Sequence, residues 1–550
     1  MLDVPATTPE CAQRWVAQLR ALRAELGWPV DAAVITRLHR DGASFAAAAD
    51  EDQLFTATEV NELAWLRLVA EQGVIAWPLA PGYPAVFDAE SARQTLRRAA
   101  AAECAPRWRE LSNKAAQRGL SVLCDDDAFS LGSGCGGRTW PLQALPEAVD
   151  WPSLSDVPIA LVTGSNGKTT TVRLVAAMSA AAGRAPGFNC TDGVFVDGEC
   201  VLRGDYSGPA GARAVLRDPR AQMAVLETAR GGILRRGLAV RRADAAIVTN
   251  VSPDHFGEYG VHDLSDLADA KLVVARALGP NGTLVVNADD ALLVAKSTAL
   301  SVPLAWFALD DAHPLLVAHR ARGGGTCAVA DGRLRLHWQG VAHDLGSVAA
   351  MPLTVGGSAA YNVANLAGAA LLAAAIGIGV APIAAVCQRF GARRDDNPGR
   401  LERWQIGAVD VLVDYAHNPE GLAGLLRVAE QLRETRDGRV GLLLGQAGNR
   451  EDSAIHALAQ VAAAHRPDQI VLKDIPGMLR GRAPGEVPGL LRDGLLNAGF
   501  AASDLRIELD ELEAARQLWS WSRPGDVLVL PVHAAATRLA LAQWLDALAR

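Results

Sequence analysis

Residues 161–171 read L-V-T-G-S-N-G-K-T-T-T. An apolar segment at 158–162 leads into this stretch, and a segment at 169–182 that favours a helix continues from it. This order of strand, glycine turn and helix constrains the fold more than any other feature. The glycines let backbone N–H groups close around phosphate oxygens, and the helix directs the positive end of its dipole at the same anion. We predict a nucleoside triphosphate site made by Gly164, Ser165, Asn166, Gly167, Lys168, Thr169 and Thr170.

Two residues of this loop have specific predicted roles. Lys168 can reach the terminal phosphates, and the hydroxyl of Thr169 can bind Mg²⁺. The spacing G-x-x-G-K-T is shorter than the general phosphate-loop pattern, so the motif by itself is also compatible with a structural turn. The strand before it and the helix after it favour the phosphate loop.

The composition limits the class of protein. The chain has 550 residues, half of them hydrophobic, which is enough for about three or four domains. A net charge of −8 argues against a general nucleic-acid binder. Eight scattered cysteines without a C-x-x-C pair favour reduced thiols in a cytoplasmic protein over disulfides or a zinc site.

The longest uncharged run covers residues 366–386 and has two interpretations. It is long enough for a membrane span, but its alanines and glycines and Pro382 favour a buried helix, a turn and a second helix. The beginning of the sequence has no basic-then-apolar signal pattern. From these features we expect no membrane as a partner, and from the negative net charge we expect no nucleic acid.

The order of apolar and polar segments predicts an α/β protein with three domains. Residues 1–150 predict a smaller α+β domain, and a glycine-rich stretch at 131–138 within it favours a structural turn over a second phosphate loop. Residues 151–396 alternate strands (158–162, 223–227, 245–249 and 283–287) with helices, as in a parallel sheet. Residues 397–550 repeat this pattern at 409–414, 439–444, 469–473 and 526–530, which predicts a Rossmann-like domain.

Polar clusters follow several of these strands, where an open α/β sheet binds its ligands. Glu227 ends one strand and can bind Mg²⁺ beside the phosphate loop, although a surface acid is the alternative. Asn250, Asp254 and His255 follow another strand, and this histidine could be a metal ligand or a packed core residue. Asn287 follows a third strand.

Two further stretches begin the last domain. They are N-P-G-R-L-E at 397–402 and V-D-Y-A-H-N-P-E-G at 413–421. Arg400 and His417 could bring positive or hydrogen-bonding groups to a nucleotide held by the middle domain.

Taken in this order, the clusters closely resemble the Mur ligase family of ATP-dependent amide ligases. T-G-S-N-G-K-T-T-T resembles its phosphate loop, and the two stretches above resemble signatures of its C-terminal domain. Within the family, stretches 204–213, 227–238 and 479–487 are similar to the ligase half of cyanophycin synthetases. About 150 residues precede the phosphate loop, too few for that group's additional ATP-grasp domain, so we expect a relative without one.

The resemblance implies a two-step reaction with ATP and Mg²⁺. A carboxylate attacks the γ-phosphate to give an acyl phosphate, and an amino acid amine then displaces phosphate to leave an amide. It implies that Lys168, Glu227, His255 and Lys271 are catalytic, and that Thr169, Glu227, His255 and Lys271, the last as a carbamate, hold metal. It implies that Asn287, Asn362, Arg400, Asp414 and His417 contact the nucleotide.

The substrates are an acidic amino acid or peptide and an amino acid amine, by the same resemblance. Arg230 and Arg235 are weak candidates for the carboxylates, with a solvated basic turn as the alternative. Asn449 and Arg450 are weak candidates for the amine side.

The competing functions are a peptidoglycan-type or folate-type ligase, a nucleotide-binding paralogue without catalysis, and a transporter ATPase or GTPase switch. The short loop and the two C-terminal signatures disfavour the last of these. The role of residues 1–150 and self-association stay open.

Overall fold

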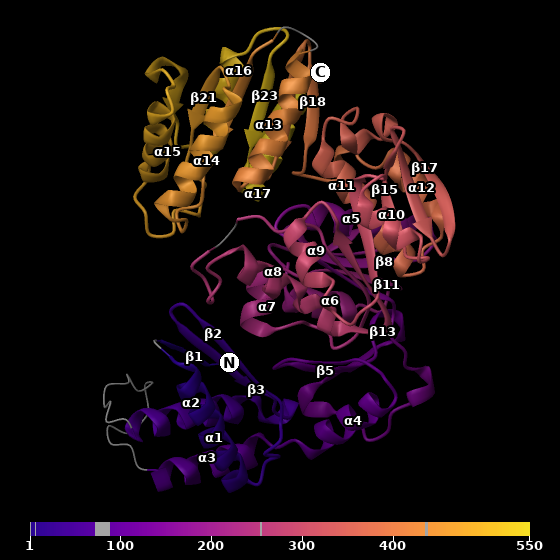
Figure 1. Ribbon diagram of the computed structural model, residues 1–550, viewed down its shortest axis with the longest axis vertical. Helices are drawn as coiled ribbons and strands as arrows, with labels where there is room; N and C mark the ends of the chain where they lie inside the picture. Colours follow the sequence, from indigo (N-terminus) through magenta and orange to yellow (C-terminus); the bar gives the residue numbers. More distant parts are fainter. Residues whose placement is uncertain (1, 6, 72–88, 254–255, 435–437) are drawn as a thin grey trace. The chain divides into compact units, whose positions relative to one another are not determined.

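The computed structural model describes residues 2–5, 7–71, 89–253, 256–434 and 438–550 (Figure 1). The chain divides into two compact units. One contains Met1–Asp156 and Phe256–Asp266, and the other contains Val157–His255 and Leu267–Arg550.

The N-terminal unit has two small antiparallel sheets. Beside the first sheet, Trp15 of α1 (Pro9–Leu26) stacks on Phe45 of β3 (Gly42–Ala47) with ring centroids 4.4 Å apart, within an apolar cluster. The elements around this cluster are β1 (Leu2–Pro5), α1 (Pro9–Leu26), β2 (Val34–His39), β3 (Gly42–Ala47), α2 (Leu54–Glu71) and α3 (Ala89–Glu103). The second sheet packs on α4 (Pro106–Gln117) and contains β4 (Val122–Cys124), β5 (Ala128–Leu131) and β6 (Arg138–Pro141).

The glycine-rich stretch of residues 131–138 joins β5 to β6 in this second sheet. The N–H of Ser133 donates to the carbonyl of Ser155 at 3.1 Å, and a Cβ added at Gly136 would collide with the Ser155 hydroxyl. The stretch is therefore a structural turn, as predicted.

The second unit begins with a large mixed sheet. Its strand order is β10-β9-β8-β11-β7-β12-β13-β14-β15-β16-β17. The parallel strands are β8 (Pro186–Cys190), β11 (Met223–Glu227), β7 (Ile159–Thr163), β12 (Ala243–Val248), β13 (Leu278–Asn287), β14 (Leu304–Asp310) and β15 (Thr326–Ala330). Antiparallel hairpins extend both edges through β9 (Gly193–Val196), β10 (Glu199–Arg203), β16 (Arg333–Trp338) and β17 (Val341–Ser347). The four strands predicted for this region are confirmed.

Helices cover this sheet because its strands are apolar on both faces. Val172, Leu366 and Ile383 from three helices share one buried cluster with Val225 and Ile247 of the sheet. The helices of this region are α5 (Lys168–Ala181), α6 (Pro209–Arg217), α7 (Arg230–Arg236), α8 (Leu264–Leu272), α9 (Ala291–Ser297), α10 (Pro314–Arg320), α11 (Ala360–Ala375) and α12 (Val380–Arg389).

The uncharged run 366–386 forms the end of α11, a turn at Gly377 and most of α12, so the helix–turn–helix interpretation is confirmed. Over the residues that the structure describes, no helix is both long enough and apolar enough to cross a bilayer.

The C-terminal sheet has the order β18-β19-β23-β20-β21-β22. Its strands are β18 (Glu402–Ile406), β19 (Val409–Asp414), β20 (Val440–Leu444), β21 (Gln469–Leu472), β22 (Leu505–Ile507) and β23 (Val527–Pro531), and β18 alone of these runs antiparallel to its neighbour.

Alternate residues of the four central strands, β19, β23, β20 and β21, face two separate cores. Leu442 packs with α13 (Pro419–Glu434), α14 (Asp452–His465) and α15 (Glu486–Asn497), whereas Leu443 packs with α16 (Glu511–Trp521) and α17 (Ala535–Leu548). Both faces are therefore covered, as in the predicted Rossmann-like arrangement (Figure 1).

Candidate nucleotide and ligase site

The phosphate loop between β7 and α5 is packed tightly against two other elements. Gly164 has a φ of +147°, and a Cβ there would collide with the Thr249 hydroxyl. Gly167 has a φ of +82°, and a Cβ there would collide with the Asn365 amide of α11. Glycine is needed at both positions because any side chain would push the loop away from its neighbours.

The first turn of α5 carries the lysine and the threonine hydroxyl of the loop. Lys168 Nζ donates to the carbonyl oxygens of Gly164 and Ser165, at 3.0 and 2.9 Å. The hydroxyl of Thr169 donates to Oε2 of Glu227 at 2.8 Å. The loop therefore presents its threonine to Glu227 at the end of β11, and the charge of its lysine acts on the same carboxyl.

Glu227 is buried, with 1% of its surface exposed. Its Oε1 accepts no hydrogen bond from any residue that the structure describes. Desolvation raises the pKa of this carboxyl, and the positive charge of Lys168 and the Thr169 hydrogen bond oppose that shift. A buried carboxylate oxygen without a partner beside a threonine hydroxyl fits the oxygen ligand set of Mg²⁺.

Asparagines from neighbouring strand ends hold the loop from the other side. Asn250 Oδ1 accepts from the N–H of Asn166 at 2.8 Å, and Asn287 Nδ2 donates to the carbonyl of Thr249 at 3.1 Å. Asn362 is buried and accepts from the Asn365 side chain at 3.1 Å. The Asn250 contact fixes the backbone of the loop, whereas Asn287 orders the segment at Thr249 and Asn362 orders α11 beside the loop.

The C-terminal sheet contributes Arg400, Asp414 and His417. The guanidinium of Arg400 lies over the ring of Tyr415, 4.4 Å from its centroid, and donates to the hydroxyl of Thr191 at 3.1 Å. Asp414 accepts from two backbone N–H groups, those of Leu401 and Ala416.

Desolvation raises the pKa of the Asp414 carboxyl, and the positive charge of Arg400 opposes the shift most strongly. The carboxylate is thus tied to the two backbone segments that carry Arg400 and His417, and it orders both of them.

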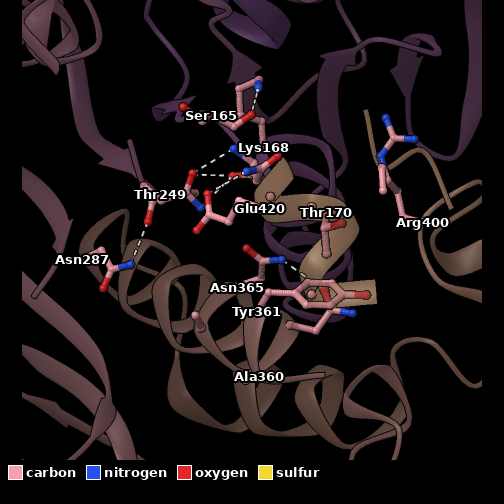
Figure 2. A pocket seen from close by; sticks show the side chains of 18 of the residues that line it. Ser165, Lys168, Thr170, Thr249, Asn287, Ala360, Tyr361, Asn365, Arg400 and Glu420 are labelled. Carbon is pink, nitrogen blue, oxygen red and sulfur yellow. Dashed lines mark hydrogen bonds between the residues drawn. The ribbon is translucent and has the colours of Figure 1, made fainter. Parts of the chain in front are cut away.

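Direct hydrogen bonds join the phosphate loop to the C-terminal elements. Asn166 Nδ2 donates to Glu420 at 3.0 Å, and Asn166 Oδ1 accepts from Asn418 at 2.8 Å. Asn397 donates to the hydroxyl of Thr170 at 3.1 Å. Figure 2 shows Glu420 beside the loop that carries Ser165 and Lys168.

These groups surround one cavity of about 790 Å³. It is lined by twelve of the residues predicted from the sequence: Ser165, Asn166, Gly167, Lys168, Thr169, Thr170, Glu227, Asn287, Asn362, Arg400, Asp414 and His417. Residues that sequence reasoning missed also line it, among them Thr191, Tyr361, Asn365, Glu420, Arg427 and Gln431. Their polar and aromatic side chains carry no recognisable spacing. Of these six residues only Glu420 lies inside a motif singled out from the sequence, the stretch 413–421, so only it could have been found.

Other predicted residues lie outside this lining. Gly164 contributes its carbonyl to Lys168, and Lys271 is buried on α8 with 3% of its surface exposed. Arg230 is buried at the start of α7, Arg235 is exposed and donates to the Gly231 carbonyl, and Asn449 and Arg450 follow β20. His255 and Asp254 lie outside the described residues, so their roles stay predictions.

Comparison with protein families identifies two parts of the second unit. Residues 162–373 match the Mur ligase middle domain, and residues 399–531 match the Mur ligase glutamate ligase domain.

Individual proteins are similar over the same region. A cyanophycin synthetase of Synechocystis sp. is 35% identical over 401 residues, which are 71% of this chain and 45% of that protein. The UDP-N-acetylmuramoyl-L-alanyl-D-glutamate–2,6-diaminopimelate ligase of Xanthomonas campestris is 30% identical over 377 residues, covering 67% of this chain and 70% of that enzyme. A crystal structure of MurF from Acinetobacter baumannii is 18% identical, with a TM-score of 0.49 over 71% of this chain and 77% of that one. The chain spans less than half the length of the cyanophycin synthetases it matches.

Proposed function

Because this chain belongs to the Mur ligase family, we propose that it is an ATP-dependent ligase joining a carboxylate to the amine of an amino acid. We assign nucleotide binding to residues 151–396, closure of the site to residues 397–550, and a separate N-terminal domain to residues 1–150. ADP and inorganic phosphate are the expected co-products.

One observation carries the proposal. A single cavity brings Lys168, Thr169 and Glu227 from one sheet together with Arg400 and His417 from another. A simple phosphate-loop switch needs only the set formed by Lys168, Thr169 and Glu227. A ligase needs both, because a triphosphate, a carboxylate and an amine must meet in one water-poor space.

The first step is attack of a substrate carboxylate oxygen on the γ-phosphorus of ATP. ADP leaves, and an acyl phosphate forms. Two anions must approach each other, so the loop N–H groups, the positive end of α5 and Lys168 stabilise the charge on the transferred group. A Mg²⁺ ion held by Thr169 and Glu227 would supply further positive charge at the phosphates.

The second step is attack of the amine nitrogen on the acyl carbon. The tetrahedral intermediate loses inorganic phosphate, and the nitrogen loses a proton to leave the amide. The hydrogen bond that Asn166 donates to Glu420 and the one it accepts from Asn418 hold the two halves of the cavity together, which limits hydrolysis of the acyl phosphate.

The substrates follow from the similarity to cyanophycin synthetases, and they are an acidic amino acid or short peptide and an amino acid amine. Arg230 and Arg235 are proposed for the carboxylates, and Asn449 and Arg450 for the amine side. Lys271, buried in α8, is proposed as a metal-site residue together with His255.

The test is phosphate release from ATP by the purified full chain with Mg²⁺, over a matrix of acceptors and amines. Aspartate, glutamate and β-aspartyl-arginine serve as acceptors, arginine and lysine as amines, and product masses are recorded in parallel. Release that requires both partners, with the mass of one new amide, supports the proposal. Tight ATP binding without release for any pair would overturn it in favour of a nucleotide-binding protein without catalysis.

A further inference from the structure

A second group of side chains with metal-binding chemistry lies in the N-terminal unit. It is formed by the β2–β3 hairpin and the loop of residues 256–266, which belong to the same compact unit. Arg37 and His39 point to one face of β2 because side chains of a strand alternate. Arg37 donates to the carbonyls of Tyr259 and Gly260, at 3.0 and 2.7 Å, and so attaches the loop to the strand.

The loop is shaped around the ring of His39. Gly260 has a φ of +66°, and a Cβ there would lie 2.7 Å from two ring carbons of His39. The backbone N–H of His262 donates to Asp266 at 3.0 Å, which fixes the following turn. The ring of His39 therefore has a defined place against the loop, and glycine at position 260 makes room for it.

Three potential metal ligands converge at this contact. One ligand atom from each of His39, Asp41 and His262 lies within 4.8 Å of the other two. His262 Nε2 is 3.1 Å from an Asp41 oxygen, and the two histidine rings have centroids 6.2 Å apart. Nδ1 of His39 is buried and has no hydrogen-bond partner among the described residues. A buried ring nitrogen without a partner is costly unless a ligand satisfies it.

We propose that His39, Asp41 and His262 bind a divalent cation of the zinc class, at a site distinct from the nucleotide cavity. Two imidazoles and one carboxylate suit Zn²⁺ or Co²⁺, whereas Mg²⁺ prefers oxygen ligands alone. Metal–ligand bonds of about 2.0–2.1 Å place tetrahedral ligand atoms roughly 3.3 Å apart. The three side chains therefore close on the cation by small rotations, with a fourth position for water.

The consequence is a cross-link between the hairpin and the loop. His39 and Asp41 are anchored in β2 and the turn after it, whereas His262 lies far along the chain, just before α8. The cation would hold residues 256–266 against the hairpin more firmly than the two Arg37 hydrogen bonds do.

The experiment measures metal binding by the full chain, independently of catalysis. The protein is stripped with a chelator and dialysed into buffer with excess Mg²⁺. Zn²⁺ binding is then measured by competition with a chromophoric chelator, and Co²⁺ binding by its visible absorption. The expected result is one tight equivalent per chain, weakened more than tenfold in His262→Ala and in Asp41→Asn.

Asp41→Asn keeps the shape of an exposed side chain, so it tests the site without disturbing the fold. His343→Ala is the matched control, because this partly exposed histidine of β17 lies outside the group. Circular dichroism checks that all variants are folded. Wild-type affinity in both His262→Ala and Asp41→Asn, or no saturable site in the wild type, overturns the proposal.

Discussion

The two sheets of the second unit each have a lysine and a glutamate at or just beyond the carboxyl ends of their parallel strands, and the two pairs are arranged differently. In the large sheet, Lys168 donates to backbone carbonyls and Glu227 accepts from a threonine. In the C-terminal sheet, Lys473 and Glu511 form a direct buried ion pair.

The C-terminal pair is completed by His533. Lys473 Nζ lies 3.1 Å from Nδ1 of His533, whose backbone N–H donates to Glu511 at 3.0 Å and whose Nε2 lies 3.1 Å from the Ala416 carbonyl. The positive charge of Lys473 and the hydrogen bonds outweigh burial and lower the pKa of Glu511 to about 2. Burial and Lys473 lower the pKa of His533 to about 4.

The difference separates a binding arrangement from a structural one. Glu227 has one oxygen without a hydrogen bond among the described residues and a raised pKa, so an added cation would stabilise it. Glu511 already has its cation, and its network supports the backbone at Ala416, next to His417 of the cavity. Substitutions at the first pair should affect turnover, and substitutions at the second should affect folding.

The largest expected effect is that of Lys168→Met on turnover. Loss of this positive charge from the phosphate loop should slow ATP-dependent phosphate release by about a hundredfold or more. Its Nζ donates to the carbonyls of Gly164 and Ser165 in its own loop, so the unfolding midpoint should stay close to that of the wild type. Steady-state kinetics and thermal melts measure both, and a variant with wild-type turnover would remove the distinction between the pairs.

Lys473→Met should have the largest effect on stability. It leaves Glu511 buried without its cation, which costs about 3–5 kcal/mol of the free energy of unfolding. Urea unfolding followed by circular dichroism measures the loss. Adding Glu511→Gln should recover part of it, because the uncompensated charge is then removed. An unchanged urea midpoint in the single variant would contradict a structural role.

The pH dependence of stability should show the C-terminal network next. The folded pKa of His533 is about 4 against an ordinary 6.5, so the unfolded chain binds more protons between these values. This contribution is fully present above pH 6.5 and lost as the pH falls towards 4, by up to about 3 kcal/mol. His533→Gln should flatten that part of a stability–pH curve, and an unchanged slope would count against a buried neutral imidazole.

The smallest expected effect is that of Glu227→Gln on the stability of the unliganded protein. A raised folded pKa means that stability is lost as the pH rises through it, so the neutral amide should be equal in stability or higher by about 1 kcal/mol at neutral pH. Stabilisation by Mg²⁺ and ATP should fall in the same variant. Thermal shift with and without ligand measures both, and a large loss without ligand would show that Glu227 is a structural residue.

Much of the second unit could be predicted from local pattern. The segments at 223–227 and 409–414 are strands with the predicted bounds, because continuous apolar runs between polar loops mark strands buried on both faces. The loop glycines were found for the same local reason. The short strands β9, β10 and β22, at or next to the sheet edges, were not predicted, because strands of three to five residues differ little from loops in composition.

The sequence by itself determined the phosphate loop, the α/β class, the resemblance to Mur ligases and twelve of the residues around the cavity. These depend on spacings of a few residues, within which the chain's own geometry fixes what lies together. The tertiary structure alone decided that Asn166 meets Glu420 and that Lys473 meets Glu511 and His533. Such partners are distant in sequence, and only the packing of the sheets and their helices brings them within hydrogen-bonding distance.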